Sequence, residues 1–249
     1  MSKQGRLDET LNNIQGRYTF EIELPPPVSV EVADALEWLQ GLNSETAHLV
    51  ITDPPYDSLE EHRARGTTTR LTNEWFEVVD ERYYRPLFLE FRRVMRRNAH
   101  GYCFCDQSTL PHIKDAVENA GLRWFKFLVW DKCDIGLGYH YRSQHELVAF
   151  FGRESGRHLR DRSIGDVLRY KRVRGGYPTQ KPVELCQTFV TQSSGPGQHV
   201  IDPFCGSGTT GVAARLEGRT FAGCDVSKEA VETARARIDE VNVQGGEDG

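Results

Sequence analysis

The sequence predicts an α/β fold with a doubly wound, mostly parallel sheet. Two observations support this prediction. Short, nearly all-apolar segments typical of buried parallel strands alternate with helical segments, and a glycine-rich loop joins one of these strands to a helix. The 249 residues suit one sizeable domain. We expect that domain over residues 28–244, between tails at residues 1–27 and 245–249.

Most of the expected helices have a starting or an ending signal in the sequence. Asp34, Asn73 and Ser227 are residue types that cap helix N-termini, and glycines follow several of the helical segments. A proline suits the first turn of one helix and breaks another. In chain order, the expected helices are residues 34–41, 74 to about 97 with a break at Pro86, 110–120, 182–191 opened by Pro182, 209–216 and 227–241.

The expected strands are short and apolar on both faces, as in a sheet covered by helices on each side. They are residues 48–52, 101–105, 124–130, 146–151, 200–201 and 220–224. Cys103 and Cys105 alternate along one strand and are predicted to be small buried side chains on the same face. Polar loops are expected over residues 57–73, 131–139 and 153–176.

Composition excludes several classes of protein. The net charge of −5 excludes a uniformly basic nucleic-acid binder, although not a local basic patch. No apolar run approaches the roughly 20 residues that span a membrane, and residues 1–17 lack the apolar core of a signal peptide. The six cysteines have neither zinc-ligand nor disulfide-framework spacing, so we expect no metal and a reducing, cytoplasmic location.

The glycine-rich loop spans residues 202–211. Gly206, Gly208 and Gly211 fit the pattern G-x-G-x-x-G, which lets a ligand approach the backbone beside the free N–H groups of a helix start. The next strand leads to Asp225, 19 residues after Gly206, where a carboxylate can accept hydrogen bonds from ribose hydroxyls. This arrangement indicates an adenosine-type nucleotide site. An ordinary dinucleotide dehydrogenase would place the loop near its N-terminus instead.

A second motif, Asp53-Pro-Pro-Tyr56, directly follows the expected strand 48–52. Its two prolines fix the backbone and remove two N–H donors. The local surface is therefore rich in acceptors, namely the Asp53 carboxylate and the Pro54 carbonyl, which match the two N–H donors of an exocyclic amine. Tyr56 adds a ring that can stack on a planar base. The motif indicates a site for an amino-substituted base.

Together these motifs resemble those of the beta-class DNA amino-methyltransferases, the adenine-N6 and cytosine-N4 methylases of DNA. In that family the catalytic motif precedes the S-adenosylmethionine loop. The matching segments are residues 52–56, 177–182 and 200–214, with further matches at Arg219, Phe221, Gly223, Asp225 and Arg237. Family members often have His where this chain has Tyr177. The resemblance covers about residues 28–240 and implies a Rossmann-like methyltransferase fold with a circularly permuted motif order and a small recognition insert over residues 153–176.

The resemblance also assigns roles to residues. Phe204 flanks the adenine of S-adenosylmethionine, Asp225 binds its ribose, and Ser207 and Thr209 hold its methionine carboxylate. The segment with Thr179 and Lys181 borders the methionine end. The implied catalytic residues are Asp53, Pro54, Pro55 and Tyr56, and the implied cofactor-binding residues are Asp53, Thr179, Lys181, Asp202, Phe204, Gly206, Ser207, Gly208, Thr209 and Asp225.

The implied reaction is transfer of a methyl group from S-adenosylmethionine to the exocyclic amine of a base flipped out of double-stranded DNA. A motif that begins with Asp favours adenine N6, and cytosine N4 is the first alternative. Further alternatives are an RNA amine methyltransferase, a nicotinamide-dependent oxidoreductase and a non-catalytic DNA-binding module on the same fold. Neither Cys103 nor Cys105 has the Pro-Cys setting of a nucleophile, so no covalent adduct with the base is expected.

The expected DNA contacts lie in two arginine-rich loops. Between residues 153 and 174, eight basic side chains oppose three acidic ones, a local net charge of +5. The candidates are Arg63, Arg65 and Arg70 in the loop after the catalytic motif, and Arg157, Arg160, Arg162, Arg169, Lys171, Arg172 and Arg174 in the second loop. So short a recognition segment predicts a short target site or help from a second subunit in a homodimer. A cognate restriction enzyme encoded elsewhere is a further partner to consider, and no membrane is expected.

Overall fold

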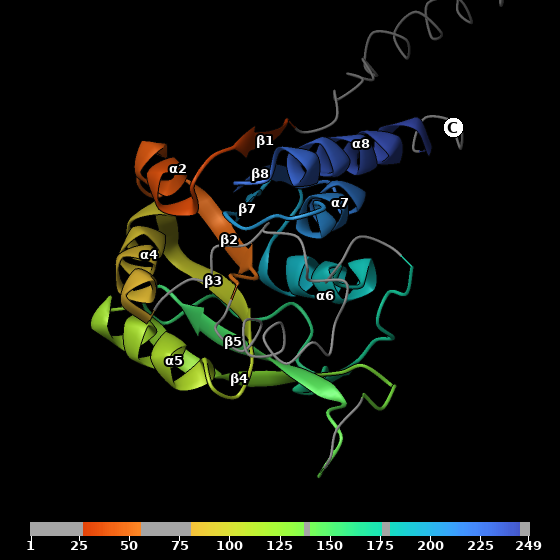
Figure 1. Ribbon diagram of the computed structural model, residues 1–249. Coiled ribbons are helices and arrows are strands. Elements are labelled where there is room, and N and C mark those ends of the chain that lie inside the picture. The colour runs from red at the N-terminus through yellow and green to blue at the C-terminus, as the bar shows by residue number, and fades with distance from the viewer. Residues whose placement is uncertain (1–26, 56–80, 137–139, 176–179, 245–249) are drawn as a thin grey trace, which may run out of the picture.

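The computed structural model describes residues 27–55, 81–136, 140–175 and 180–244 (Figure 1). Its centre is an eight-stranded sheet in the order β1-β8-β7-β2-β3-β5-β4-β6. Only β5 runs against its neighbours, since it pairs antiparallel with β3 and β4 while every other pair is parallel. The strands are β1 (Val28–Val32), β2 (Ala47–Thr52), β3 (Met95–Cys105), β4 (Arg123–Asp131), β5 (His145–Gly152), β6 (Val167–Arg169), β7 (His199–Asp202) and β8 (Thr220–Asp225).

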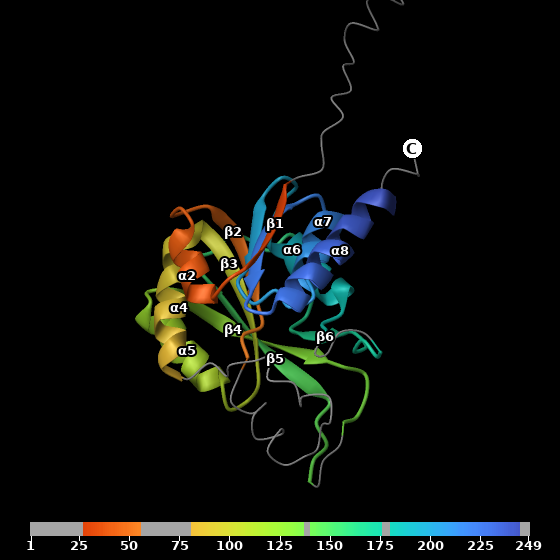
Figure 2. The same ribbon diagram turned by 45° about the horizontal axis from the view of Figure 1, so that its top comes forward.

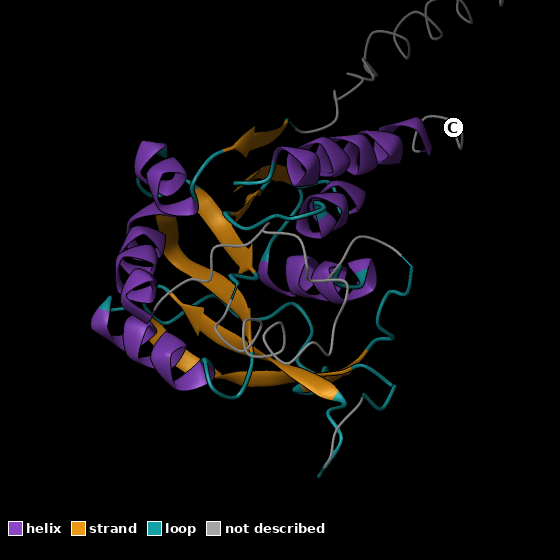
Figure 3. Ribbon diagram, in the orientation of Figure 1, coloured by secondary structure: helices purple, strands orange, loops and turns teal. Residues whose placement is uncertain are grey.

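Helices cover both faces of this sheet, as Figures 2 and 3 show, which confirms the predicted doubly wound α/β architecture. On one face lie α2 (Ala35–Gly41), α4 (Glu81–Val94) and α5 (Leu110–Asn119), and on the other lie α6 (Val183–Ser193), α7 (Thr209–Leu216) and α8 (Lys228–Gln244). Of these helices as the structure describes them, none is long and apolar enough to cross a membrane.

Each face of the sheet has its own hydrophobic core. Along β3, Cys103 and Cys105 pack with the α2, α4 and α5 side, whereas Tyr102 and Phe104 pack with the α6, α7 and α8 side. Both cysteines are completely buried, as predicted, and burial raises the pKa of their thiols. Buried side chains on both faces explain why the central strands read as continuous apolar runs.

The helix predicted to reach about residue 97 ends earlier, so that prediction was wrong. The α4 helix stops at Val94, and β3 begins at once with Met95, which pairs with Ala47. Pro86 lies inside α4 without ending it. A proline removes one backbone hydrogen bond, and the completely buried Leu87 and Phe88 beside it anchor the helix to the core.

Two edge strands were not predicted from the sequence. The β1 strand pairs only with β8, and Val30 is its one buried residue. The β6 strand has three residues, of which only Leu168 is buried. Edge strands this short have too little hydrophobic alternation to be predicted from sequence.

The parallel arrangement determines where a site can lie. Because β2, β7 and β8 are parallel neighbours, the residues at their carboxyl ends share one edge of the sheet. These residues are Asp53 just after β2, Asp202 at the end of β7 and Asp225 at the end of β8. The two motifs of the sequence therefore meet at this edge, which we call the carboxyl edge.

Candidate active site

The glycine loop connects β7 to α7 in a tight turn. Gly206 and Gly208 both have left-handed backbone angles, with φ of 48° and 79°. The Gly208 N–H donates to the Cys205 carbonyl at 2.7 Å, and the Cys205 N–H donates to the Cys224 carbonyl at 3.0 Å. These bonds attach the loop to the neighbouring strand β8.

The three glycines of the motif are required for different structural reasons. A Cβ on Gly208 would lie 2.9 Å from the Ala234 Cα, and one on Gly211 would lie 2.3 Å from the Ile238 Cδ1. These two glycines therefore permit close packing of the loop and α7 against α8. A Cβ on Gly206 would meet nothing within 4 Å. Gly206 is thus the motif glycine whose missing side chain leaves open space beside the backbone, as a bound ligand requires.

Asp202 holds the loop from inside. Its carboxylate is buried and accepts hydrogen bonds from the Phe204 N–H at 3.1 Å and from the Thr210 hydroxyl at 2.7 Å. Burial raises the pKa of Asp202 to about 7. Phe204 itself is partly buried against the core on the α2 side. The structure therefore places Asp202 as a support for the loop, with Phe204 at its surface.

Asp225 lies at the point where the loop and β8 meet. One carboxylate oxygen accepts the Gly206 N–H at 3.0 Å, and the other accepts the Ser227 N–H at 2.9 Å. Burial raises the pKa of this carboxyl. Each carboxylate oxygen keeps a second lone pair, so Asp225 can still accept a hydroxyl of a ligand bound over Gly206.

Ser207 and Thr209 are turned toward the protein. Both are buried, and the Arg237 guanidinium of α8 donates to the Ser207 hydroxyl at 2.8 Å and to the Thr209 hydroxyl at 3.4 Å. The same nitrogen also donates to the Ser207 carbonyl at 2.6 Å. The two hydroxyls thus connect the loop to α8, a role that the resemblance had not indicated for them.

Asp53 follows β2 at the same edge, and its two carboxylate oxygens differ. The Lys181 ammonium donates to Oδ2. Oδ1 is buried and has no hydrogen-bond partner among the residues that the structure describes. Pro54 after it is buried. Asp53 therefore has one carboxylate oxygen bound by Lys181 and one buried carboxylate oxygen without a hydrogen-bond partner among the described residues.

Lys181 binds this carboxylate, whereas the resemblance had implied only that its segment borders the methionine end of S-adenosylmethionine. Its ammonium also lies 3.5 Å from Glu146 Oε2 and 4.9 Å from the centre of the Phe104 ring. Burial lowers the pKa of Lys181, but the Asp53 and Glu146 carboxylates outweigh burial and raise it. Burial likewise raises the pKa of Asp53, and Lys181 opposes that shift.

Glu146 was not identified from the sequence. It lies near the start of β5 and pairs with Lys132, whose ammonium is 2.6 Å from Glu146 Oε1. The available signal was an acidic residue opening an otherwise apolar strand. Four charged groups, Lys132, Glu146, Lys181 and Asp53, consequently form a row along the carboxyl edge.

The arginine-rich segment does not form one surface. The Arg157 guanidinium donates to the Ser193 carbonyl at 3.3 Å and to the Gln198 side chain at 2.7 Å, and the Arg160 N–H donates to the Gln192 carbonyl at 3.1 Å. These partners lie between the end of α6 and the start of β7, at the edge opposite Asp53. Arg157 and Arg160 therefore lie away from Asp53, and the expectation that residues 153–174 contact DNA stays a prediction.

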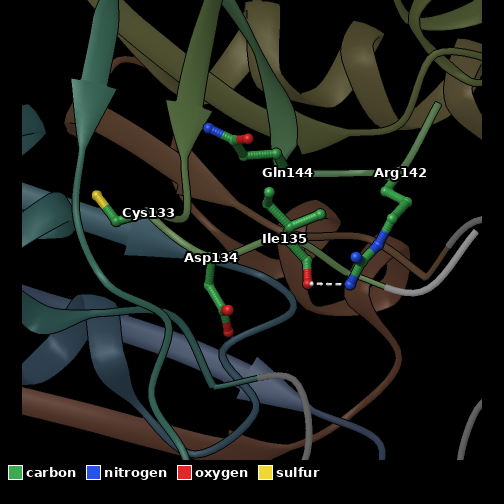
Figure 4. Close-up of a pocket in the computed structure, with 5 residues that line it drawn as sticks. All are labelled: Cys133, Asp134, Ile135, Arg142 and Gln144. Carbon is green, nitrogen blue, oxygen red and sulfur yellow. Dashed lines mark hydrogen bonds between the residues drawn. The ribbon is translucent and has the colours of Figure 1, made fainter.

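The later part of the segment does reach the carboxyl edge. Acidic side chains of the β4–β5 connection partly neutralise it. Arg169 pairs with Asp131 at 3.3 Å, and both Arg172, at 3.2 Å, and Arg174 pair with Asp134. Lys171 is exposed beside them. Asp134 also lines an open hollow with Cys133, Ile135, Arg142 and Gln144 (Figure 4).

Several predicted site residues lie outside the described part of the chain. They are Tyr56, Arg63, Arg65, Arg70 and Thr179.

Comparisons with known proteins identify the family of this chain. A family model described as DNA methylase matches residues 47–236, well over half of the chain. The type II methyltransferase M2.DpnII of Streptococcus pneumoniae is 36% identical and covers 84% of this chain and 89% of its own length. The DNA adenine methyltransferase YhdJ of Escherichia coli is 26% identical over 83% of this chain and 81% of its own.

Solved structures share the fold. The M1.HpyAVI-SAM complex has a TM-score of 0.63 at 24% identity and covers 84% of this chain and 99% of that chain. The cytosine-N4-specific PvuII DNA methyltransferase has a TM-score of 0.65 at 15% identity and covers 87% and 90%. Given these matches and the two motifs at one sheet edge, the chain belongs to the DNA methylase family and is an S-adenosylmethionine-dependent DNA methyltransferase.

Proposed function

We propose that this methyltransferase modifies adenine N6 in double-stranded DNA, with Asp53 as the acceptor of the target amine. The observation that carries the proposal is the buried Oδ1 atom of Asp53, which has no partner among the described residues. A buried oxygen without a donor is costly, so such an atom is suited to a donor that arrives with the substrate. An exocyclic amine is that donor.

The reaction needs little from the protein beyond position and preplaced acceptors. Asp53 Oδ1 and the Pro54 carbonyl would accept the two N–H bonds of a flipped base, with Tyr56 stacked on its ring. Accepting both N–H bonds draws the nitrogen lone pair out of conjugation with the ring. S-adenosylmethionine supplies an electrophilic methyl group on a sulfonium sulfur. After the transfer, the surplus proton on nitrogen passes to Asp53 or to solvent.

The residues at the glycine loop fit the cofactor. Gly206 leaves open space beside its backbone, and Asp225, which already holds the Gly206 N–H, keeps lone pairs for ribose hydroxyls. We place Phe204 against the adenine ring. Because Ser207 and Thr209 are bonded to Arg237 and Lys181 is bonded to Asp53, we assign these three to the support of the two motifs.

Adenine is favoured over cytosine by two observations. The catalytic motif begins with Asp, and the relative YhdJ, 26% identical, is named a DNA adenine methyltransferase. The cytosine-N4-specific PvuII enzyme shares the fold at 15% identity. Both amines present two N–H donors, so the acceptor geometry serves either base. We also propose residues 28–244 as a single catalytic domain, while a homodimer and a cognate restriction enzyme stay predictions.

Replacing Asp53 with Asn tests the proposed acceptor and the target base together. The amide keeps the shape of the side chain but loses its charge, and we expect methyl transfer to fall about 10²–10³-fold, with affinity for S-adenosylmethionine within a few-fold of the parent. Digestion of DNA modified by the parent enzyme, followed by nucleoside mass spectrometry, should show N6-methyl-2′-deoxyadenosine. Full activity of the Asp53→Asn protein would refute the role of Asp53. N4-methylcytosine would refute only the choice of base.

Alanine at Gly208 should mainly lower stability, whereas alanine at Gly206 should mainly weaken cofactor binding. Gly208→Ala places a Cβ 2.9 Å from the Ala234 backbone at a φ of 79°, so we expect a loss of thermal stability. Gly206→Ala meets no atom within 4 Å, so it should cost only about 1–2 kcal/mol of stability for its left-handed φ. It should nevertheless weaken S-adenosylmethionine binding at least tenfold in calorimetric titration. Parental affinity in Gly206→Ala would move the cofactor away from this loop.

Basic side chains at the carboxyl edge and at the opposite edge of the sheet should contribute differently to DNA binding. Lys171→Gln with Arg174→Gln removes two exposed charges at the carboxyl edge, whereas Arg96→Gln with Arg160→Gln removes two exposed charges elsewhere. The first pair should weaken DNA binding and reduce the slope of log K against log salt by about one to two. The second pair should leave the slope unchanged, and equal losses in both would contradict this division.

A further inference from the structure

We propose that Glu146 is a positioning residue for methyl transfer, which holds the ammonium groups of Lys132 and Lys181 in a charge-balanced row and so orients the Asp53 carboxylate. This inference rests on the proposed role of Asp53. Neither Glu146 nor Lys132 belongs to the motifs that identify the family in this chain.

The row joins four different parts of the fold. Lys132 directly follows β4, Glu146 lies in β5, Lys181 precedes α6 and Asp53 follows β2. The Lys132 ammonium lies 2.6 Å from Glu146 Oε1, the Lys181 ammonium lies 3.5 Å from Glu146 Oε2, and Lys181 then donates to Asp53 Oδ2. Glu146 thus lies between the two ammonium groups, close to Lys132 and in a longer ion pair with Lys181, in which Oε2 makes no hydrogen bond among the described residues.

The four charged groups of the row are largely removed from water, so their ion pairs add little to the stability of the fold. The exposed fraction of the side chains is 10% for Lys181, 21% for Glu146, 25% for Lys132 and 26% for Asp53. Ion pairs that are this far removed from water gain little over apolar side chains of similar size, because desolvation offsets their attraction. Their position against an open acceptor atom therefore indicates a role in the reaction.

The consequence for Asp53 is both geometric and electrostatic. Lys181 occupies Oδ2, which leaves Oδ1 directed to the substrate, and Glu146 restrains the ammonium that does so. Without Glu146, the net charge of the row would change from zero to +1. An ammonium with one carboxylate in reach, in place of two, would also pair with Asp53 more tightly and could cover both of its oxygens.

The groups that act on the Asp53 charge are known from the structure. Lys181 and Lys132 lower its pKa, and Glu146 raises it. Asp202 from β7 also faces it, as do the buried thiols Cys103, Cys105 and Cys186, whose own pKa values are raised by burial. Removing the Glu146 charge should therefore lower the pKa of Asp53, and removing the Lys132 charge should raise it.

The experiment compares Glu146→Gln, Lys132→Gln and the double variant by the single-turnover rate of methyl transfer as a function of pH. In Glu146→Gln we expect the rate at its optimum to fall about ten- to hundredfold, with the Kd for S-adenosylmethionine within about twofold. The acidic limb of its pH profile should move to lower pH. In Lys132→Gln the limb should move to higher pH, and in the neutral double variant it should return toward the parent.

The matched control is Glu45→Gln, which removes the carboxylate that pairs with Arg153 at 2.6 Å, outside the row. It should keep the parental rate and pH limb.

A parental rate and limb in Glu146→Gln, or movement of both single-variant limbs in the same direction, would overturn the inference. If Asp53→Asn is inactive while Glu146→Gln is parental, only this inference fails. If Asp53→Asn is fully active, the proposed function fails. Should Glu146→Gln not fold, the Lys132→Gln limb still decides.

Discussion

The ion pair between Lys181 and Asp53 is the contact on which the active site depends. The two residues lie 128 positions apart in the chain, and they meet only because α6 packs on the sheet beside β2. Lys181 binds one carboxylate oxygen, and the other is buried without a hydrogen-bond partner among the described residues. The same parallel packing places β7 beside β2, so the glycine loop begins at the edge of the sheet where Asp53 lies. Acceptor and cofactor loop are therefore brought together by strand order, although their motifs are far apart in sequence.

The sequence was sufficient for the architecture and for the two motifs, because both rest on local patterns. Apolar strands, capping residues and the glycine spacing act within a few residues of one another, and the central strands and most helices agree with the structure. The functions of Lys181, Ser207 and Arg237 depend on tertiary contacts, which no local pattern encodes. Glu146 was missed for the same reason, since one acidic residue at a strand start is ordinary until two lysines are seen to meet it.

The basic segment shows how a charge count can mislead. A local net charge of +5 describes residues 153–174 in sequence, but the short edge strand β6 separates the two halves of that segment. Arg157 then serves the junction of α6 and β7, while Arg169, Arg172 and Arg174 meet acidic partners of the β4–β5 connection. The net charge of −5 does not exclude DNA binding, because we propose that DNA contacts a local basic region at the carboxyl edge.

We propose that Asp53 Oδ1 receives the target amine while Lys181 holds Oδ2. The most direct test of this arrangement is a crystal structure with S-adenosylhomocysteine and a DNA duplex that contains the unmethylated target site. We expect a flipped adenine whose N6 lies about 2.7–3.1 Å from Asp53 Oδ1. The Lys181 ammonium should still donate to Asp53 Oδ2. An amine bound elsewhere, or a Lys181 that has left Asp53 to contact the cofactor, would contradict it.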